Sequence, residues 1–253
     1  MNSYCRFKKI SVWLVILVAM SLISATCTKK TSKKIGPTRL SDMEYKEILK
    51  DFKALNPIQI SDSGIKAVEG TPDGYIVIHK FMDYQCSHCY DTSFMLNKAM
   101  ERWPGRIKLV IRQFPLDGTC NPAIKNKQEG SYSCNGAQAS LCVAGKPYFS
   151  KFHHALFSYL HDQKRLSIEN IEETVKSLGG NWQEVLSCMG SAETARRLNV
   201  DLSDAEKVKV RSTPTLLVNG RLLPPGTPNE EYFFYLIDAL VLEKEGASAF
   251  GGK

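Results

Sequence analysis

The sequence predicts an α/β protein in which parallel strands are joined by a helix and a helical segment is inserted before the last strands. Two apolar runs, residues 75–82 and 107–111, indicate buried strands. Between them, apolar side chains recur at the spacing of one helix face over residues 87–103. Strand, helix and strand with continuous apolar runs imply a parallel pair. We therefore expect one α/β domain over residues 57–245, long enough for a sizeable core.

The first 27 residues predict an export signal. Arg6, Lys8 and Lys9 precede an apolar run over residues 10–23 that two serines interrupt. This run is short for a membrane span, which needs about 20 residues. It suits the apolar part of a signal peptide that follows a basic segment. We expect a signal peptide over residues 1–27, with an uncleaved anchor as the alternative.

Cys27 is a candidate lipidation site. Residues 24–27, Ser-Ala-Thr-Cys, form an imperfect lipobox. Of the eight cysteines, Cys5 leaves with the signal and the six from Cys86 onward can pair, so Cys27 is the odd thiol unless a lipid consumes it. Lipidation, ordinary cleavage near Ala25 and a retained anchor stay open. In each case we expect the folded part in the periplasm or cell envelope, where disulfides persist.

Positive charge is concentrated at the N-terminus. The net charge is +7, but residues 1–40 hold eight Lys or Arg and no Asp or Glu, so the rest of the chain has a net charge of −1. A folded part without a basic patch gives a nucleic-acid partner nothing to bind. The basic stretch belongs to the signal and to a solvated tether. Tether and N-terminal helix together make up residues 28–56, with the helix expected over residues 42–55.

The motif Cys86-Ser87-His88-Cys89 follows the first apolar strand and opens the helix after it. Unpaired N–H groups and the positive end of the helix dipole favour an anion there, so Cys86 should ionise below the pKa of about 8.5 of a free cysteine. His88 adds positive charge when protonated. Cys89, one helical turn on, is placed to resolve a mixed disulfide. We predict a redox-active dithiol in which Cys86 is the nucleophile, Cys89 resolves, His88 stabilises the thiolate, and no other cofactor takes part.

Two other uses of a Cys-x-x-Cys compete with this hypothesis. Zinc usually takes four ligands and a second such pair, and the sequence has no second Cys-x-x-Cys. A purely structural bridge over so short a loop constrains the unfolded chain least. His153, His154 and His161 lack a carboxylate or cysteine to complete a ligand set, so we expect ordinary surface or boundary histidines. We expect no bound metal.

The segment after the second strand is predicted to be helical over residues 136–210, which form the insertion. An apolar stripe over residues 148–160 is expected in the core. Asn181 stands at capping-box spacing from Glu184 and predicts a helix start. A short edge strand is expected at residues 57–60.

The C-terminal part predicts a β-hairpin and a last helix. Residues 215–218 have a strand pattern, Asn219-Gly220 has the signature of a type I′ turn, and residues 221–223 supply the partner strand. A helix is expected near residues 229–242. Residues 246–253 are expected to form a flexible tail.

This order of elements resembles the thioredoxin fold in its DsbA-like form, with a helical insertion. The likeness covers about residues 57–245 and rests on residues 83–89, Asp-Tyr-Gln-Cys-Ser-His-Cys, and residues 213–220, Thr-Pro-Thr-Leu-Leu-Val-Asn-Gly. The resemblance implies a thiol:disulfide oxidoreductase. It also implies that Thr213-Pro214 is a cis peptide, packs on the dithiol and pairs with the main chain of the substrate.

A second likeness concerns the segment after the second strand. Phe114-Pro115-Leu116-Asp117, Cys120-Asn121, Cys134 and Cys142 resemble the DsbA-like domains found with vitamin K epoxide reductase-type membrane oxidases. This resemblance implies a quinone-linked membrane enzyme as the reoxidising partner.

Three positions depart from the family pattern. Ser87-His88 replaces the Pro-His typical of oxidases, and Thr213 is commoner in isomerase-like relatives. The N-terminal part, however, is too short for the dimerisation domain of those isomerases. Lys80 stands where many relatives have a buried acid. If Lys80 points at the dithiol, it would favour thiolates by charge attraction, but it cannot act as a carboxylate proton acceptor for Cys89.

We therefore expect an exported monomeric dithiol oxidase that donates the Cys86–Cys89 disulfide to reduced exported substrate proteins. Its expected reoxidising partner is a membrane enzyme of the vitamin K epoxide reductase-like or DsbB-like type. One alternative is a reductase or isomerase of the same fold. The other is a metal-carrying binding module that uses Cys86 and Cys89.

Four further cysteines allow three pairings. Cys120 and Cys134 bracket a polar segment with too little apolar content to order itself, so a bridge between them is expected. Cys142 and Cys188 fall in predicted helices of the insertion and can meet across a helix contact. Free buried cysteines are the alternative for this second pair.

Overall fold

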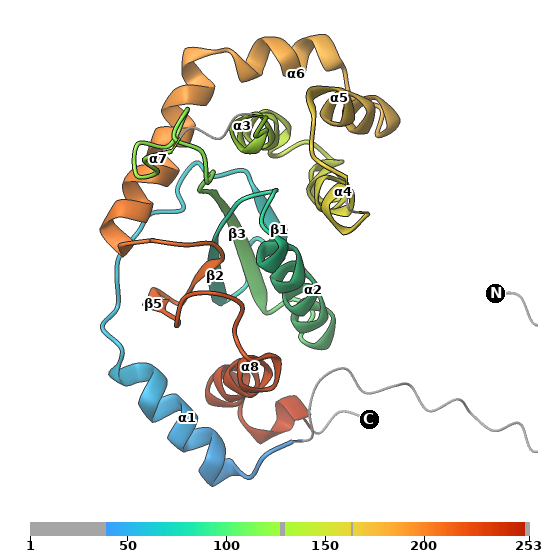
Figure 1. The fold of residues 1–253 in the computed structure, drawn as a ribbon. Helices are drawn as coiled ribbons and strands as arrows, with labels where there is room; N and C mark the ends of the chain where they lie inside the picture. The colour runs from blue at the N-terminus through green and yellow to red at the C-terminus, as the bar shows by residue number, and fades with distance from the viewer. Residues whose placement is uncertain (1–38, 127–129, 163, 251–253) are drawn as a thin grey trace, which may run out of the picture. The chain divides into compact units, whose positions relative to one another are not determined.

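The computed structural model describes residues 39–126, 130–162 and 164–250 (Figure 1). The predicted signal, Cys27 and nearly all of the tether therefore lie outside the described residues, as does the end of the predicted tail. Within the described residues, no helix combines the length and the apolar character that crossing a membrane requires.

A five-stranded sheet has the order β1-β3-β2-β4-β5. The central strands β2 (Ile76–Met82) and β3 (Ile107–Gln113) are parallel, as their continuous apolar runs predicted. The hairpin β4 (Thr215–Val218) and β5 (Arg221–Leu222) adds antiparallel to β2. Asn219 and Gly220 in its turn have φ of 46° and 77°, the positive values that a type I′ turn requires.

The predicted edge strand at residues 57–60 is wrong. Only a single bridge, between Pro57 and Arg221, joins this segment to the sheet, with the Ile58 N–H donating to the Gly220 carbonyl at 2.7 Å. The edge beside β3 is instead β1 (Val68–Gly70), antiparallel to β3. Three residues are too few for a periodic pattern in the sequence.

Side chains alternate between the two faces of the sheet along β2 and β3. Ile78 and Met82 belong to the large core cluster on one face, whereas Phe81 packs in a smaller cluster with Leu217 and the end of α7 (Ala192–Val208). Successive side chains of a strand point to opposite faces. Lys80, two residues from both Ile78 and Met82, therefore faces the large core.

Helices α1 (Asp42–Ala54), α2 (Ser87–Arg102) and α8 (Glu230–Glu245) contribute to the large core cluster, and α1 packs on α8 (Figure 1). Ser41 begins α1 with a capping box to Glu44. The predicted tail contains a short 3-10 helix, Ala247–Phe250, that contacts α8.

The insertion consists of α3 (Ser133–Val143), α4 (Phe149–His161), α5 (Ile168–Ser177), α6 (Trp182–Met189) and α7 (Ala192–Val208). The apolar stripe of α4 is in the core, as predicted, with Phe149, Phe152 and Leu156 buried. Asn181 caps α6 by accepting from the main chain of Gln183 and Glu184. Helix α4 contacts α2, which brings the insertion against the helix that carries the Cys-x-x-Cys.

The expectation for the histidines is wrong at His153. This side chain is fully buried in α4, and its Nδ1 lies 2.8 Å from the hydroxyl oxygen of Tyr84. Helical spacing alone places His153 beside the buried Phe152 and Leu156, but Tyr84 lies far away in sequence and could not be paired with it. His161 is exposed and stacks on Tyr90.

Candidate active site

Cys86 lies where β2 has ended and α2 begins, and it is the N-cap residue of α2. Its Sγ accepts a hydrogen bond from the main-chain N–H of Cys89 at 3.3 Å. An N-cap side chain satisfies one of the helix donors that have no partner within the helix. The sulfur therefore occupies the position at which the helix terminus stabilises an anion.

The two thiols have opposite properties, although three residues separate them. Cys86 is half-buried and Cys89 is completely buried, and both are free thiols. A hydrogen bond from the Cys89 thiol lowers the pKa of Cys86 to about 6, against the opposing effect of burial. Burial raises the pKa of Cys89 well above its usual range. Cys86 is thus the accessible thiolate and Cys89 the protected thiol, which matches a nucleophile and a resolving cysteine.

The Thr213–Pro214 loop faces the nucleophile. The peptide bond is cis, and the Thr213 carbonyl oxygen is 3.4 Å from Cys86 Sγ. Both residues of the loop are buried at the start of β4. The sequence predicted this proximity only through a family resemblance, because 127 residues separate the loop from Cys86.

Lys80 lies behind the dithiol on β2. Its side chain is fully buried, and Nζ donates to the carbonyl oxygen of Cys89 at 3.0 Å and to the Ser93 hydroxyl at 2.5 Å. Burial lowers its pKa to about 8, and the charges of both cysteines partly oppose this shift. The structure therefore satisfies the condition that Lys80 point toward the dithiol.

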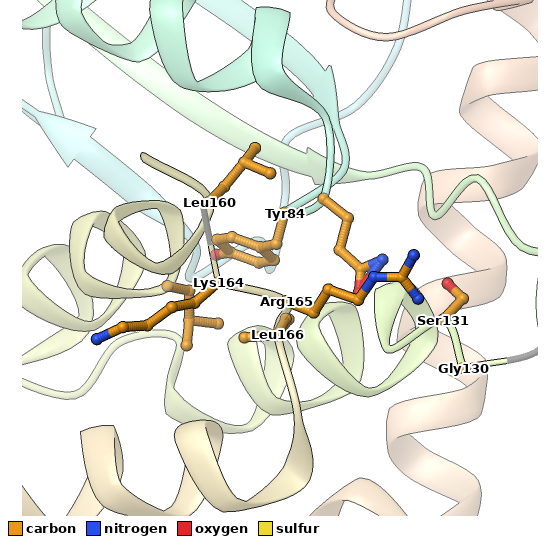
Figure 2. A pocket seen from close by; sticks show the side chains of 9 residues that line it. Tyr84, Gly130, Ser131, Leu160, Lys164, Arg165 and Leu166 are labelled. Atoms are coloured by element: carbon orange, nitrogen blue, oxygen red, sulfur yellow. The ribbon is translucent and has the colours of Figure 1, made fainter. Parts of the chain in front are cut away.

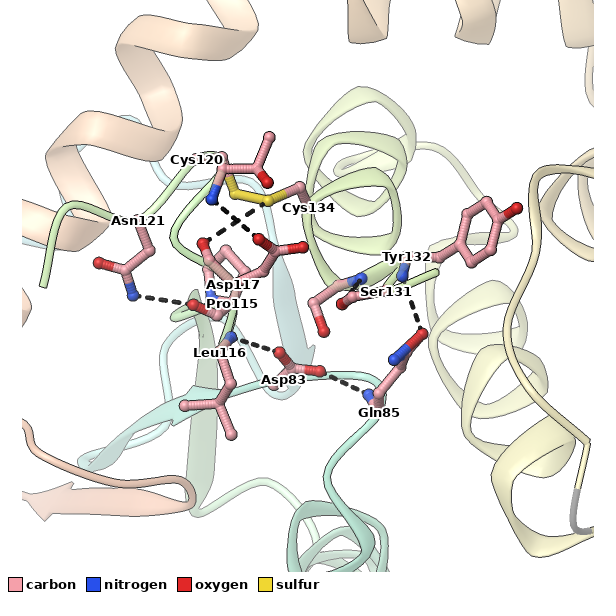
Figure 3. The surroundings of a disulfide bond; sticks show 12 residues. Asp83, Gln85, Pro115, Leu116, Asp117, Cys120, Asn121, Ser131, Tyr132 and Cys134 are labelled. Carbon is pink, nitrogen blue, oxygen red and sulfur yellow. Dashed lines mark hydrogen bonds between the residues drawn. A yellow bond between two sulfur atoms is a disulfide. The ribbon is translucent and has the colours of Figure 1, made fainter. Parts of the chain in front are cut away.

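Asp83 is a site residue whose role the sequence reasoning missed. Its carboxylate accepts from the N–H of Gln85 at 2.5 Å and from the N–H of Leu116 at 2.6 Å (Figure 3). The contact to Gln85, two residues on, is an Asx-turn, so an Asp at this distance before the Cys-x-x-Cys was a usable local signal. The Gln85 side chain in turn accepts from the N–H of Tyr132 at 3.0 Å (Figure 3). These contacts fix the loop that leads into Cys86.

His88 is exposed at the first turn of α2. Its carbonyl oxygen accepts from the hydroxyls of Thr92 and Thr227, at 2.7 and 3.1 Å, which ties the loop before α8 to the dithiol helix. Stabilisation of the thiolate by its imidazole stays a prediction.

A pocket opens beside Gln85 (Figure 2). Tyr84, Leu156, Leu160 and Leu166 form part of its lining, and two exposed basic side chains, Lys164 and Arg165, stand at it. The pocket thus joins apolar surface and positive charge next to the residue that precedes the nucleophile.

A buried polar network behind Tyr84 was not expected. The Tyr84 hydroxyl donates to Ser140 at 2.9 Å and contacts His153 on its other side. Glu69 of β1 lies near both α4 histidines, with 3.0 Å to His154 Nε2. The residues of this network come from distant parts of the chain, and no local sequence pattern predicts that they meet.

The other four cysteines form Cys120–Cys134 and Cys142–Cys188 disulfides. The first closes a loop in which the N–H of Tyr132 donates to the Gln85 side chain (Figure 3). The second joins α3 to α6. Among the described residues, no group of three or more His, Cys, Asp or Glu side chains is arranged to hold a metal ion.

Three features define a thioredoxin-fold protein of DsbA-like form: the order of the strands in the sheet, the Cys-x-x-Cys at a helix start, and the cis-proline loop that faces it. The family model described as thioredoxin matches residues 63–238. This is more than half of the chain, and the chain belongs to this family.

Solved structures share the fold. A thioredoxin-like oxidoreductase from Silicibacter pomeroyi DSS-3 is 20% identical, with a TM-score of 0.58 over 75% of this chain and 100% of that one. The thiol-disulfide exchange protein alpha-DsbA2 from Wolbachia pipientis is 20% identical, with a TM-score of 0.57 over 81% of this chain and 100% of that one.

Curated sequences match only in part. The Na(+)/H(+) antiporter NhaA 1 of Mycobacterium sp. (strain KMS) is 24% identical over 165 residues, which cover 61% of this chain and 23% of the antiporter. The chain thus spans about a quarter of the length of the curated relatives that it matches.

Proposed function

We propose that this protein is an exported thiol:disulfide oxidoreductase that works as a dithiol oxidase. The observation that carries the proposal is the asymmetry of the dithiol: the accessible Cys86 has a pKa lowered to about 6, and Cys89 is buried with its pKa raised. A stabilised Cys86 thiolate favours the reduced protein, and therefore makes the Cys86–Cys89 disulfide oxidising.

The reaction follows from these positions. A substrate thiolate attacks Cys86 Sγ, the Cys86–Cys89 bond breaks, and Cys89 leaves with the electron pair. A second substrate thiolate then attacks the substrate sulfur of the mixed disulfide, and Cys86 leaves as a thiolate. The substrate gains a disulfide and the protein retains the two electrons. The Thr213 main chain, beside Cys86, is placed to pair with an extended substrate segment.

Reoxidation completes the cycle. We assign this step to a quinone-linked membrane enzyme of the vitamin K epoxide reductase-like or DsbB-like type, with the protein acting as a monomer. Lipidation of Cys27 would raise the effective concentration of such a partner. Purified protein should be reoxidised by membranes that contain such an enzyme and not by membranes that lack it.

Equilibration with glutathione redox buffers tests the direction of the reaction. An oxidase should have a potential well above the value of about −270 mV of thioredoxin, whereas a value near or below it supports a reductase. Cys86→Ser should abolish turnover, and Cys89→Ser should accumulate mixed disulfides with substrate proteins. Trapping by Cys86→Ser in place of Cys89→Ser would contradict the assigned roles.

A further inference from the structure

Lys80 is a buried cation whose hydrogen bonds go to neutral groups. Its Nζ contacts the carbonyl of Cys89 and the hydroxyl of Ser93, and it lies 5.0 Å from the centroid of the Phe157 ring. Burying an ammonium group is unfavourable unless an opposite charge compensates it. Neutral dipoles and a ring face supply only part of that compensation.

Charged and titratable groups face Lys80 from three elements. They are Cys86 and Cys89 of α2, Glu69 of β1 and His153 of α4. Burial lowers the pKa of His153 to about 3, so its ring is neutral near pH 7.

Glu69 has its own partners. Its carboxylate accepts from the Ser150 hydroxyl at 2.6 Å and lies 3.0 Å from His154 Nε2. Burial raises the pKa of Glu69, but the neighbouring histidines and the Ser150 hydroxyl outweigh burial and lower this pKa to about 2, so its charge is constant near pH 7. The dithiol is therefore the group facing Lys80 whose charge changes during thiol:disulfide exchange.

We propose that Lys80 is the buried counter-charge of the dithiol and stabilises the thiolate that leaves when a substrate attacks the Cys86–Cys89 disulfide. The inference deepens the proposed function and rests on it. As the substrate sulfur bonds to Cys86 Sγ, the Cys86–Cys89 bond breaks and the negative charge moves from the exposed substrate sulfur to the buried Cys89 sulfur. The Lys80 ammonium group is already in place there, so no solvent has to enter. The disulfide itself is the oxidant.

The sign of this effect supports oxidation of substrates. A cation stabilises the reduced, thiolate-bearing protein relative to the disulfide form, whereas a buried carboxylate at the same place would destabilise it. Lys80 is thus a positioning residue that acts through the charge of the dithiol and raises the reduction potential.

Replacement of Lys80 tests the proposal. In Lys80→Met, the equilibrium constant with glutathione should shift about tenfold toward the disulfide form, which is a potential lower by about 30 mV. The matched control is Lys98→Met, an exposed lysine of α2 whose ion pair is with Glu230, and its potential should equal that of the wild type. Equal potentials in Lys80→Met and Lys98→Met would overturn the proposal.

The pH dependence of the wild-type potential gives a second test that needs no substitution. In the reduced protein burial lowers the pKa of Lys80 to about 8, although the cysteine charges oppose this shift. In the disulfide form those charges are absent, so the pKa of Lys80 is lower still. At a pH between the Lys80 pKa values of the disulfide and reduced forms, Lys80 takes up an additional proton when the protein is reduced. With rising pH the potential therefore falls more steeply there than it would without Lys80, by at most about 30 mV more per pH unit. Lys80→Met should lose this component. A wild-type slope without it refutes the role of Lys80.

These outcomes separate the two proposals. A wild-type protein without exchange activity refutes the proposed function. An active, oxidising wild type whose potential and slope are unchanged in Lys80→Met refutes only the role of Lys80.

Discussion

Two buried cations lie on the central strands, on opposite faces of the sheet, and their charges are compensated in different ways. Arg112 of β3 is in the register position beside Phe81 and faces α7, where it pairs with Asp201 at 3.0 Å and Asp204 at 3.3 Å. Lys80 faces α2 and contacts neutral groups beside the two thiols. A buried cation with carboxylate partners belongs to a closed structural cluster. A buried cation without carboxylate partners can instead stabilise a negative charge that forms during the reaction.

The largest expected effect on stability comes from breaking the closed cluster. Arg112→Met removes the buried cation that pairs with Asp201 and Asp204, of which Asp204 keeps an exposed partner in Lys207, and should lower the free energy of unfolding by about 3–5 kcal/mol. Urea unfolding of the disulfide form measures this change. Arg196→Met is the control on α7, because that ion pair is exposed and worth about 1 kcal/mol or less. The reduction potential of folded Arg112→Met should remain at the wild-type value, and a shift as large as that of Lys80→Met would contradict the comparison.

The next effect concerns the Cys120–Cys134 disulfide, which is expected to be structural and to have no part in the exchange. Its removal in the double variant Cys120→Ala/Cys134→Ala opens a loop with a sequence separation of 14 and should cost about 3 kcal/mol of stability. Peptide mapping after mild reduction should find this bridge intact while Cys86 and Cys89 are labelled. Labelling of Cys120 at the same rate as Cys86 would refute the structural role.

The stability of the reduced protein should depend on pH through Cys86. Its folded pKa of about 6 lies below the value of about 8.5 of a free cysteine. A lowered pKa contributes stability that is fully present above the unfolded value and is lost as pH falls through the folded value. The free energy of unfolding of the reduced wild type, relative to Cys86→Ser, should therefore rise between about pH 6 and 8 and be flat below about pH 5. A difference that is flat from pH 5 to 8 would show that Cys86 is an ordinary thiol.

The smallest expected change in stability is that of Lys80→Met. The Ser93 hydroxyl also donates to the Cys89 carbonyl at 3.0 Å, so removing the lysine leaves neither group without a partner. Methionine fills a similar space without a buried charge, and the free energy of unfolding should change by about 1 kcal/mol or less. A loss of stability as large as that of Arg112→Met, measured by urea unfolding, would show that Lys80 has a structural role like that of Arg112.

Local patterns in the sequence were sufficient for much of the fold. The apolar runs of β2 and β3, the helical spacing of α2 and the Asn219-Gly220 turn each depend on neighbouring residues, and the structure has all of them. The edge strand β1 escaped prediction because three residues carry no period, and its pairing with β3 is a tertiary contact.

The sequence by itself determined where the dithiol lies: a Cys-x-x-Cys at a strand-to-helix junction puts Cys86 at a helix terminus, and that is a local property. Tertiary structure decided what surrounds it. The contact of Thr213 with Cys86, the contact of Lys80 with the Phe157 ring and that of His153 with Tyr84 join segments far apart along the chain. The physical reason is that burial and Coulomb interactions depend on distance in space, which no local sequence pattern contains.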